Sequence, residues 1–304
     1  MRRAIKATVE GAVVATGMAR WARTRRVRDT IVLAYHNIVP AGETRTGDLS
    51  LHLPWVRFAA QLDSLAETHD VVPLDAIDSA PAEDGRRPRA IITFDDAYRG
   101  AVMAGVDELA RRGMPATIFV PPAFVGGHSF WWDALTPPNE SAVKPSLREH
   151  ALGPLRGENT AVRRWARNQG LSEYEVPEHA RCASYAELTA AANQPGITMG
   201  SHSWSHANLA MLATAELEQE IMRPLTWLRA RFKAVSDYLS YPYGSTSDNV
   251  RVIASGSGYR GGLLINGGWL GENAASPFAL PRLDVGAGIS DRGFRLRISG
   301  LFCR

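Results

Sequence analysis

Short apolar runs alternate with helical stretches from residue 31 to residue 285, and this alternation constrains the fold more than any other feature of the chain. Strands separated by helices form parallel βα units, so the pattern predicts an α/β fold, either a barrel or a doubly wound sheet. The polar, helix-leaning stretch 126–183 interrupts the rhythm and is expected to be an insertion. Strands are expected at 31–35, 90–94, 116–120, 197–200, 238–241, 262–265 and 280–285, and helices at 55–69, 101–112, 184–193 and 214–233.

The net charge of +3 is unevenly distributed over the 304 residues. Residues 1–30 contain eight basic and two acidic side chains, whereas the remaining 274 residues contain 26 basic and 29 acidic ones. A nucleic-acid-binding body would be basic across a face, so we expect no nucleic-acid partner. The two cysteines, Cys182 and Cys303, do not form a disulfide framework or a cysteine-based zinc site.

Residues 1–30 have two interpretations. Glu10 interrupts a short apolar run, so a signal peptide is not convincing. A basic amphipathic helix fits better, and it either lies on an anionic membrane surface or packs against the domain with its charges in water. No run reaches the roughly 18 apolar residues of a spanning helix, so we expect a cytoplasmic protein, with peripheral contact at the inner membrane face as the alternative. The apolar stripe of this helix would contain Ile5, Val9, Val13 and Trp21.

Polar side chains follow directly on several of the expected strands. The carboxyl ends of parallel strands meet at one edge, where α/β folds place their active sites. We therefore expect these side chains to converge on one site. They are Tyr35-His36, Asp95-Asp96, His202 with His206, and Pro242-Tyr243-Gly244.

The adjacent carboxylates of Asp95 and Asp96 leave a buried strand. They repel each other, and burying either is costly without a partner. A divalent cation would resolve this by binding one carboxylate and leaving the other free to accept a proton. The alternative is that the pair caps the helix expected from residue 101.

His202 and His206 are four residues apart, a spacing that places two imidazoles on one face of a helical turn, where they can hold a metal ion. Two neutral imidazoles and one carboxylate leave open positions on a divalent cation for a water and a carbonyl. This donor set fits zinc best, with cobalt, nickel or iron as alternatives.

Several motifs of the chain resemble those of the polysaccharide deacetylases, which are carbohydrate esterase family 4 or the NodB-homology domain. The resemblance implies a deformed (β/α)7-type barrel over residues 31–304 with a helical insertion, and a metal-dependent hydrolase. It makes Asp96, His202 and His206 the metal ligands and Asp95 the general base, and Tyr243 would offer its backbone N–H to the oxyanion. The motifs are Thr-Phe-Asp-Asp at 93–96, His-x-x-x-His at 202–206, Tyr-Pro-Tyr-Gly at 241–244, Tyr-His-Asn-Ile at 35–38 and Ala-Thr-Ile-Phe-Val at 116–120.

Three departures from the family pattern affect the site. Ala97 follows the Asp pair where glycine is common, which is harmless only at negative φ. No histidine follows His206, so the histidine that usually serves as the general acid is missing. Tyr35-His36 instead resembles the Tyr-His motif of a branch of the family that acts on exported adhesive polysaccharides. His36 is therefore expected to be either the general acid or a structural histidine. Ser240 replaces the usual arginine, and Arg282 is expected either to pair with Asp95, as in the same branch, or to lie on the surface.

The leading functional hypothesis is removal of N-acetyl groups from N-acetylhexosamine units of an oligo- or polysaccharide, within bacterial exopolysaccharide biosynthesis. An O-acetyl esterase and a catalytically silent carbohydrate-binding protein are the alternatives. Trp131-Trp132-Asp133 opens the expected insertion, and its aromatic pair either stacks on sugar rings or anchors the insertion by packing. His128 is a further candidate for the cleft.

Overall fold

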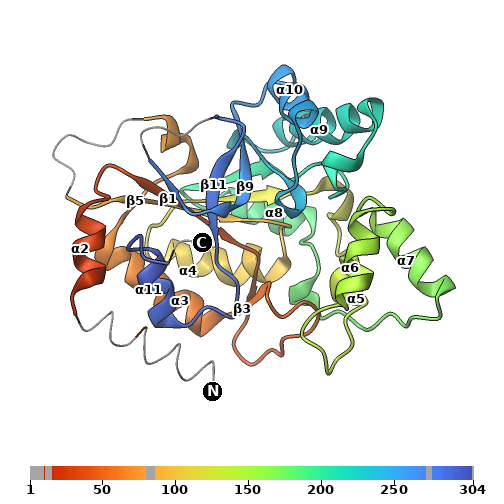
Figure 1. The fold of residues 1–304 in the computed structure, drawn as a ribbon, viewed down its shortest axis with the longest axis horizontal. Helices are drawn as coiled ribbons and strands as arrows, with labels where there is room; N and C mark the ends of the chain where they lie inside the picture. Colours follow the sequence, from red (N-terminus) through yellow and green to blue (C-terminus); the bar gives the residue numbers. More distant parts are fainter. Residues whose placement is uncertain (1–9, 11–15, 80–85, 272–275, 303–304) are drawn as a thin grey trace.

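The computed structural model describes residue 10 and residues 16–79, 86–271 and 276–302 (Figure 1). Seven parallel strands close into a barrel, because β1 pairs in parallel with both β5 and β11. This confirms the predicted (β/α)7-type barrel. In their order around the barrel the strands are β1 (Thr30–Tyr35), β5 (Arg89–Phe94), β6 (Ala116–Val120), β7 (Ile197–Ser201), β8 (Val235–Ser240), β9 (Gly261–Gly267) and β11 (Leu280–Asp284).

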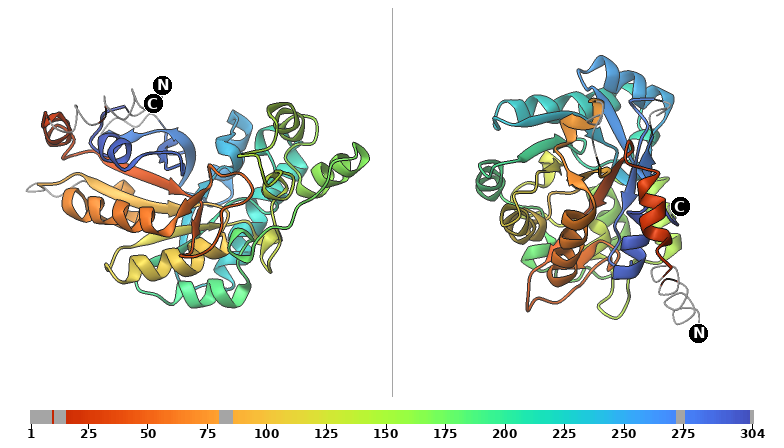
Figure 2. Two further views of the ribbon diagram at one scale, coloured as in Figure 1. Left: turned by 90° about the horizontal axis from the view of Figure 1, so that it is seen from below. Right: turned by 90° about the vertical axis from the view of Figure 1, so that its left-hand side faces the viewer.

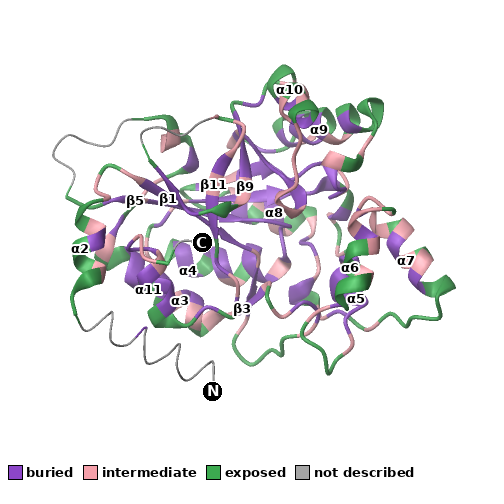
Figure 3. Cartoon of the chain, in the orientation of Figure 1, coloured by how far each residue is buried: buried purple, intermediate pink, exposed green. Residues whose placement is uncertain are grey.

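Most residues of the barrel strands are buried, as Figure 3 shows, although the second half of β9 is partly exposed. All six residues of β1 and all five of β6 are buried. Parallel strands covered on both faces are almost continuously apolar, which is why the sequence shows runs rather than alternation. Short strands extend this framework: β4 (Asp70–Val71) beside β5, β10 (Trp269–Leu270) antiparallel to β1, and the separate pair β2 (Asn37–Val39) and β3 (His52–Pro54).

Helices surround the barrel, as the two views in Figure 2 show. The expected helix at 214–233 ends earlier, at Arg229, and the one expected from residue 101 begins with a π-helical turn, η2 (Ala101–Gly105). Helices α10 and α11 were not predicted. The helices of the barrel are α3 (Trp55–Thr68), α4 (Val106–Ala110), α8 (Tyr185–Ala192), α9 (Thr214–Arg229), α10 (Asp248–Gly256) and α11 (Asp291–Arg297).

Between β6 and β7 the chain forms a helical lobe at one side of the barrel, drawn in green in Figure 1. It occupies the stretch 126–183, where an insertion was expected. Its elements are α5 (Trp131–Ala134), α6 (Pro145–Leu152), α7 (Asn159–Asn168) and the 3₁₀ turn η4 (Glu178–Ala180).

The N-terminal prediction is only partly covered, since Ile5, Val9 and Val13 lie outside the described residues. Helix α2 (Met18–Thr24) is described and carries Trp21 on an exposed face. In the described part of the chain, no helix combines the length and the apolar character needed to cross a bilayer.

Candidate active site

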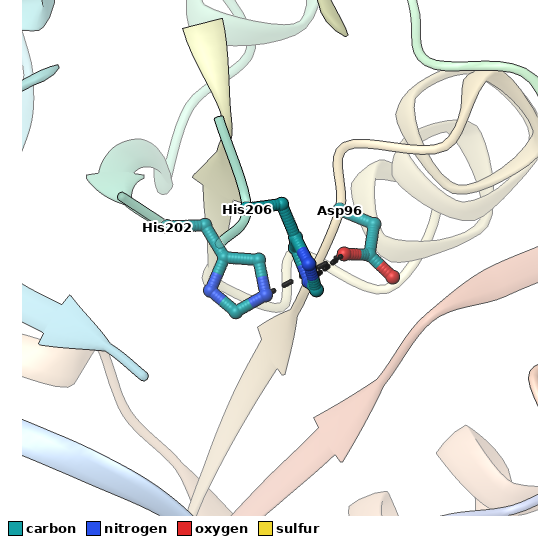
Figure 4. A group of neighbouring side chains, drawn as sticks. All are labelled: Asp96, His202 and His206. Atoms are coloured by element: carbon teal, nitrogen blue, oxygen red, sulfur yellow. Dashed lines mark ion pairs between the residues drawn. The ribbon is translucent and has the colours of Figure 1, made fainter. Parts of the chain in front are cut away.

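Asp96, His202 and His206 meet at the carboxyl ends of β5 and β7, and Figure 4 shows their side chains pointing toward one another. The Asp96 Oδ1 lies 3.0 Å from His206 Nε2 and 3.4 Å from His202 Nε2. All three side chains are almost fully buried, at 3–5% exposure. One donor atom from each residue lies within 4.8 Å of the others, so the predicted ligands form one group that could hold a metal ion.

The expected helical turn between the two histidines is wrong. His202 to His206 is an irregular loop in which Ser203 (φ 58°) and His206 (φ 57°) adopt left-handed conformations. This backbone, rather than helical spacing, brings the two imidazoles to one point. The His202 Nδ1 donates to the Ser240 carbonyl oxygen at 2.8 Å, which orients the ring so that its Nε2 faces the Asp96 Oδ1.

The electrostatics of this group fit a divalent cation. The buried Asp96 Oδ1 makes no hydrogen bond of good geometry to the described residues, which is costly for a carboxylate. Burial acts to raise the pKa of Asp96, but the two imidazoles hold it well below its ordinary value. Burial lowers the pKa of His206, which favours the neutral form that a ligand requires. Two imidazole nitrogens and one ionised oxygen are a typical zinc donor set.

The neighbouring carboxylate, Asp95, is held by a fully buried arginine. The Arg282 Nη1 donates to Asp95 Oδ1 at 2.9 Å, and the Arg282 Nη2 donates to Asp95 Oδ2 at 2.7 Å. Burial opposes the charge of Asp95, but the Arg282 charge and hydrogen bonds, with His202 nearby, bring the pKa of Asp95 to about 2. Arg282 is 0% exposed, so the structure excludes the surface alternative. Ser240, at the position of the family's usual arginine, donates its hydroxyl to Asp95 Oδ1 at 3.0 Å.

The ligand group and Asp95 open onto a pocket of about 200 Å³. His36 and Tyr243 also line it, so the structure brings six of the seven predicted residues to one cavity, with Arg282 held behind Asp95. The sequence did not single out Asp48, Arg148 and Asp284, which line the same pocket. Asp284 ends β11, so the strand-end argument applied to Asp95 could have found it.

Several residues of the site have positive φ although they are not glycine. Asp96 (φ 69°), Ala97 (φ 50°) and Tyr243 (φ 59°) all lie in the left-handed region. Ala97 is therefore at the backbone conformation for which the family's usual glycine is better suited. Such conformations cost on the order of 1–3 kcal/mol each and cluster at functional sites.

The aromatic pair of the helical lobe packs behind the site. Trp131 is fully buried and its Nε1 donates to the Tyr243 hydroxyl at 3.2 Å. Trp132 lines the pocket with its ring 5.0 Å from that of His206, yet it is only 3% exposed. Both therefore anchor the lobe to the site, as the packing interpretation predicted. His128 lines a different cavity, of about 530 Å³, whose wall is formed mainly by the lobe.

The parallel barrel holds a buried Asp-His-His group and a second carboxylate at the carboxyl ends of its strands. This arrangement suits a hydrolase that uses a metal ion. A family model described as polysaccharide deacetylase matches residues 82–262, more than half of the chain. The chain belongs to the polysaccharide deacetylase family. No curated protein matches it.

Solved structures share its fold. IcaB from Ammonifex degensii has 16% identity and a TM-score of 0.62 over 90% of this chain and 97% of that one. The deacetylase PplD from Streptococcus pyogenes, solved in complex with acetate, has 15% identity and a TM-score of 0.59 over 87% and 96%. A de-N-acetylase from Aggregatibacter actinomycetemcomitans has 14% identity and a TM-score of 0.59 over 88% and 99%.

Proposed function

We propose that this protein is a metal-dependent hydrolase that removes N-acetyl groups from the N-acetylhexosamine units of a polysaccharide. The observation that carries the proposal is the buried Asp96, His202 and His206 group directly beside the Asp95–Arg282 pair in one pocket. A de-N-acetylase is among the proteins that share the fold, which supports the N-acetyl substrate.

Asp96, His202 and His206 would hold the cation, and zinc suits their donor set best. When bound, the cation supplies Lewis-acid chemistry: it polarises an acetyl carbonyl and activates water as a nucleophile. Burial of all three ligands keeps bulk water from competing with the substrate.

The other residues would handle protons and charge. Asp95 takes the proton of the attacking water, and Arg282 keeps it ionised at neutral pH for that task. The left-handed backbone of Tyr243 presents its amide N–H to the developing oxyanion. His36, which lines the same pocket, returns a proton to the departing sugar amine.

The Asp95–Arg282 pair also argues against a silent carbohydrate-binding protein. Burying a carboxylate and a guanidinium costs several kcal/mol per ion before their attraction is counted. Asp95 lies directly beside the Asp96, His202 and His206 group, where a metal-activated water would need a proton acceptor. A proton acceptor in a hydrolytic reaction needs that charge.

The test compares acetate release from N-acetylated chitooligosaccharides and from O-acetylated xylan. We expect release from the former, accompanied by one free amine per acetate, and a loss of at least 10²-fold in Asp95→Asn. Release only from xylan would favour the O-acetyl esterase. Full activity of Asp95→Asn would contradict the proposed base.

We also propose that residues 1–30 contact an anionic membrane at the inner face. Helix α2 exposes Met18 (43%) and Trp21 (59%), and the Arg25 guanidinium lies 4.5 Å from the Trp21 ring centre. Exposed aromatic and basic side chains on one helix suit a membrane interface. Less Trp21→Ser variant than wild-type protein should sediment with anionic vesicles, and neither form should sediment with neutral vesicles. Equal sedimentation of both forms with anionic vesicles would contradict this contact.

A further inference from the structure

The pocket that holds the proposed reaction is too small for several sugar units of a polymer. Its volume of about 200 Å³ lies below the 300–1,000 Å³ of ordinary ligand sites. A polymer substrate must therefore place its neighbouring units elsewhere on the surface. The chain segments that line the pocket continue into a neighbouring cleft, which is a candidate site for these units.

A second cleft, of about 810 Å³, adjoins the pocket and shares Ser50 with it. Two chain segments line both cavities in succession. The first runs from Arg45 to Ser50, with Asp48 in the pocket and Arg45 in the cleft. The second runs on from the end of β11, with Asp284 in the pocket and Ala287 and Gly288 in the cleft. The Ala287 amide donates to the Ser50 carbonyl at 2.8 Å and joins the two segments.

The cleft carries side chains suited to sugar hydroxyl and acetamido groups. Arg57 is held in place, because its Nη1 donates to the Ala287 carbonyl at 2.7 Å and its Nε lies 3.4 Å from Asp291. Arg45 is exposed and makes no hydrogen bond or ion pair to the part of the chain that the structure describes. Its guanidinium is therefore free to donate several hydrogen bonds to a neutral saccharide.

We propose that this cleft, bounded by Arg45, Ser50, Arg57 and Gly288, is a second saccharide subsite that binds units next to the one being deacetylated. The proposal rests on the deacetylase function proposed above. The subsite makes long chains better substrates than short ones, because contacts in the cleft hold the chain while its acetamido group enters the pocket.

Gly288 allows the cleft to be filled without disturbing the fold. A Cβ at Gly288 meets no atom within 4 Å, and its φ is not in the left-handed region. The exposed Gly256 of α10 has the same two properties and does not line the cleft. Gly288→Phe is therefore the blocking variant and Gly256→Phe its matched control. Arg45→Ala tests the polar contact, with Arg45→Lys as the conservative variant.

The experiment measures kcat/KM for acetate release with the N-acetylglucosamine monomer, which does not reach the cleft, and with the hexamer, together with calorimetric hexamer binding to each variant. In the wild type and in Gly256→Phe, kcat/KM should be about tenfold higher for the hexamer, as expected for one or two charge-assisted hydrogen bonds. Gly288→Phe should lose this advantage and bind the hexamer about tenfold more weakly, because the phenylalanine ring occupies the cleft. Arg45→Ala should lose most of the advantage and Arg45→Lys less.

Equal hexamer binding by Gly288→Phe and the wild type overturns the subsite, and so does an equal loss of kcat/KM on monomer and hexamer. A wild-type protein that binds the hexamer through the cleft but releases no acetate from either length refutes the deacetylase function and keeps the subsite. The binding measurement thus decides the subsite, and the release of acetate decides the reaction.

Discussion

The buried Asp95–Arg282 pair makes a strong prediction about stability. In Arg282→Met the aliphatic volume is largely kept, but both hydrogen bonds from the guanidinium to Asp95 disappear. Asp95 then remains as a buried charge without its counterion. Removing one partner of a buried pair typically costs about 3–5 kcal/mol, and we expect a loss of this size at pH 7.

The dependence on pH tests the cause of that loss. The pKa of Asp95 in the folded wild type is about 2, below its ordinary value of 3.8, so its stabilising contribution is complete above 3.8 and lost as the pH falls through about 2. In Arg282→Met, burial without the guanidinium raises this pKa. The variant then gains stability relative to the wild type as the pH falls from 7 toward 4, because Asp95 becomes protonated.

Urea unfolding at pH 7 and pH 4, with a chelator in every sample, measures both effects. The double variant Asp95→Asn/Arg282→Met should recover about 2 kcal/mol relative to the sum of the single variants, since no charge is left unpaired. A cost below about 1 kcal/mol for Arg282→Met, or a cost that does not change with pH, would refute the proposed role of the pair.

Three further predictions concern the site and its support. Asp96→Ala should abolish zinc binding in calorimetry; retention of one zinc per chain would contradict the ligand assignment. Asp133→Ala should lower the free energy of unfolding by about 3 kcal/mol or more, because its carboxylate accepts hydrogen bonds from the Asp48 amide, His52 and the Tyr98 hydroxyl; urea unfolding checks this. Gly200→Ala should cost about 1–3 kcal/mol in the same assay, because the new Cβ would lie 2.5 Å from the Phe119 ring, and an unchanged midpoint would be evidence against this packing.

The barrel could be predicted because strands that are buried on both faces consist almost entirely of apolar residues. Each parallel strand is a short apolar run, and the run that forms β6 has the predicted bounds. The polar residues after such runs then point to the site, which is how Asp95 and Asp96 were found. The resemblance of Arg282 to an arginine of one family branch also predicted its pairing with Asp95, which the structure contains as a buried contact.

The remaining features have no comparable signal. Ser203 and His206 adopt left-handed backbone conformations that tertiary contacts impose. Neither serine nor histidine predicts such a conformation, so the sequence pattern wrongly indicated a helical turn here. Arg148 reaches the pocket from α6, in a lobe whose position depends on buried packing around Trp131. Helices as short as α11, with seven residues, carry too few turns for a clear periodicity.

The most direct test of the account is to return zinc to protein stripped of metal and to follow acetate release from an N-acetylated oligosaccharide. The account predicts no release from stripped protein, a rise that reaches its plateau at about one zinc per chain, and no recovery in Asp96→Ala at any zinc level. Full release from stripped protein, or equal recovery in Asp96→Ala, would contradict a metal-dependent deacetylase built on Asp96, His202 and His206.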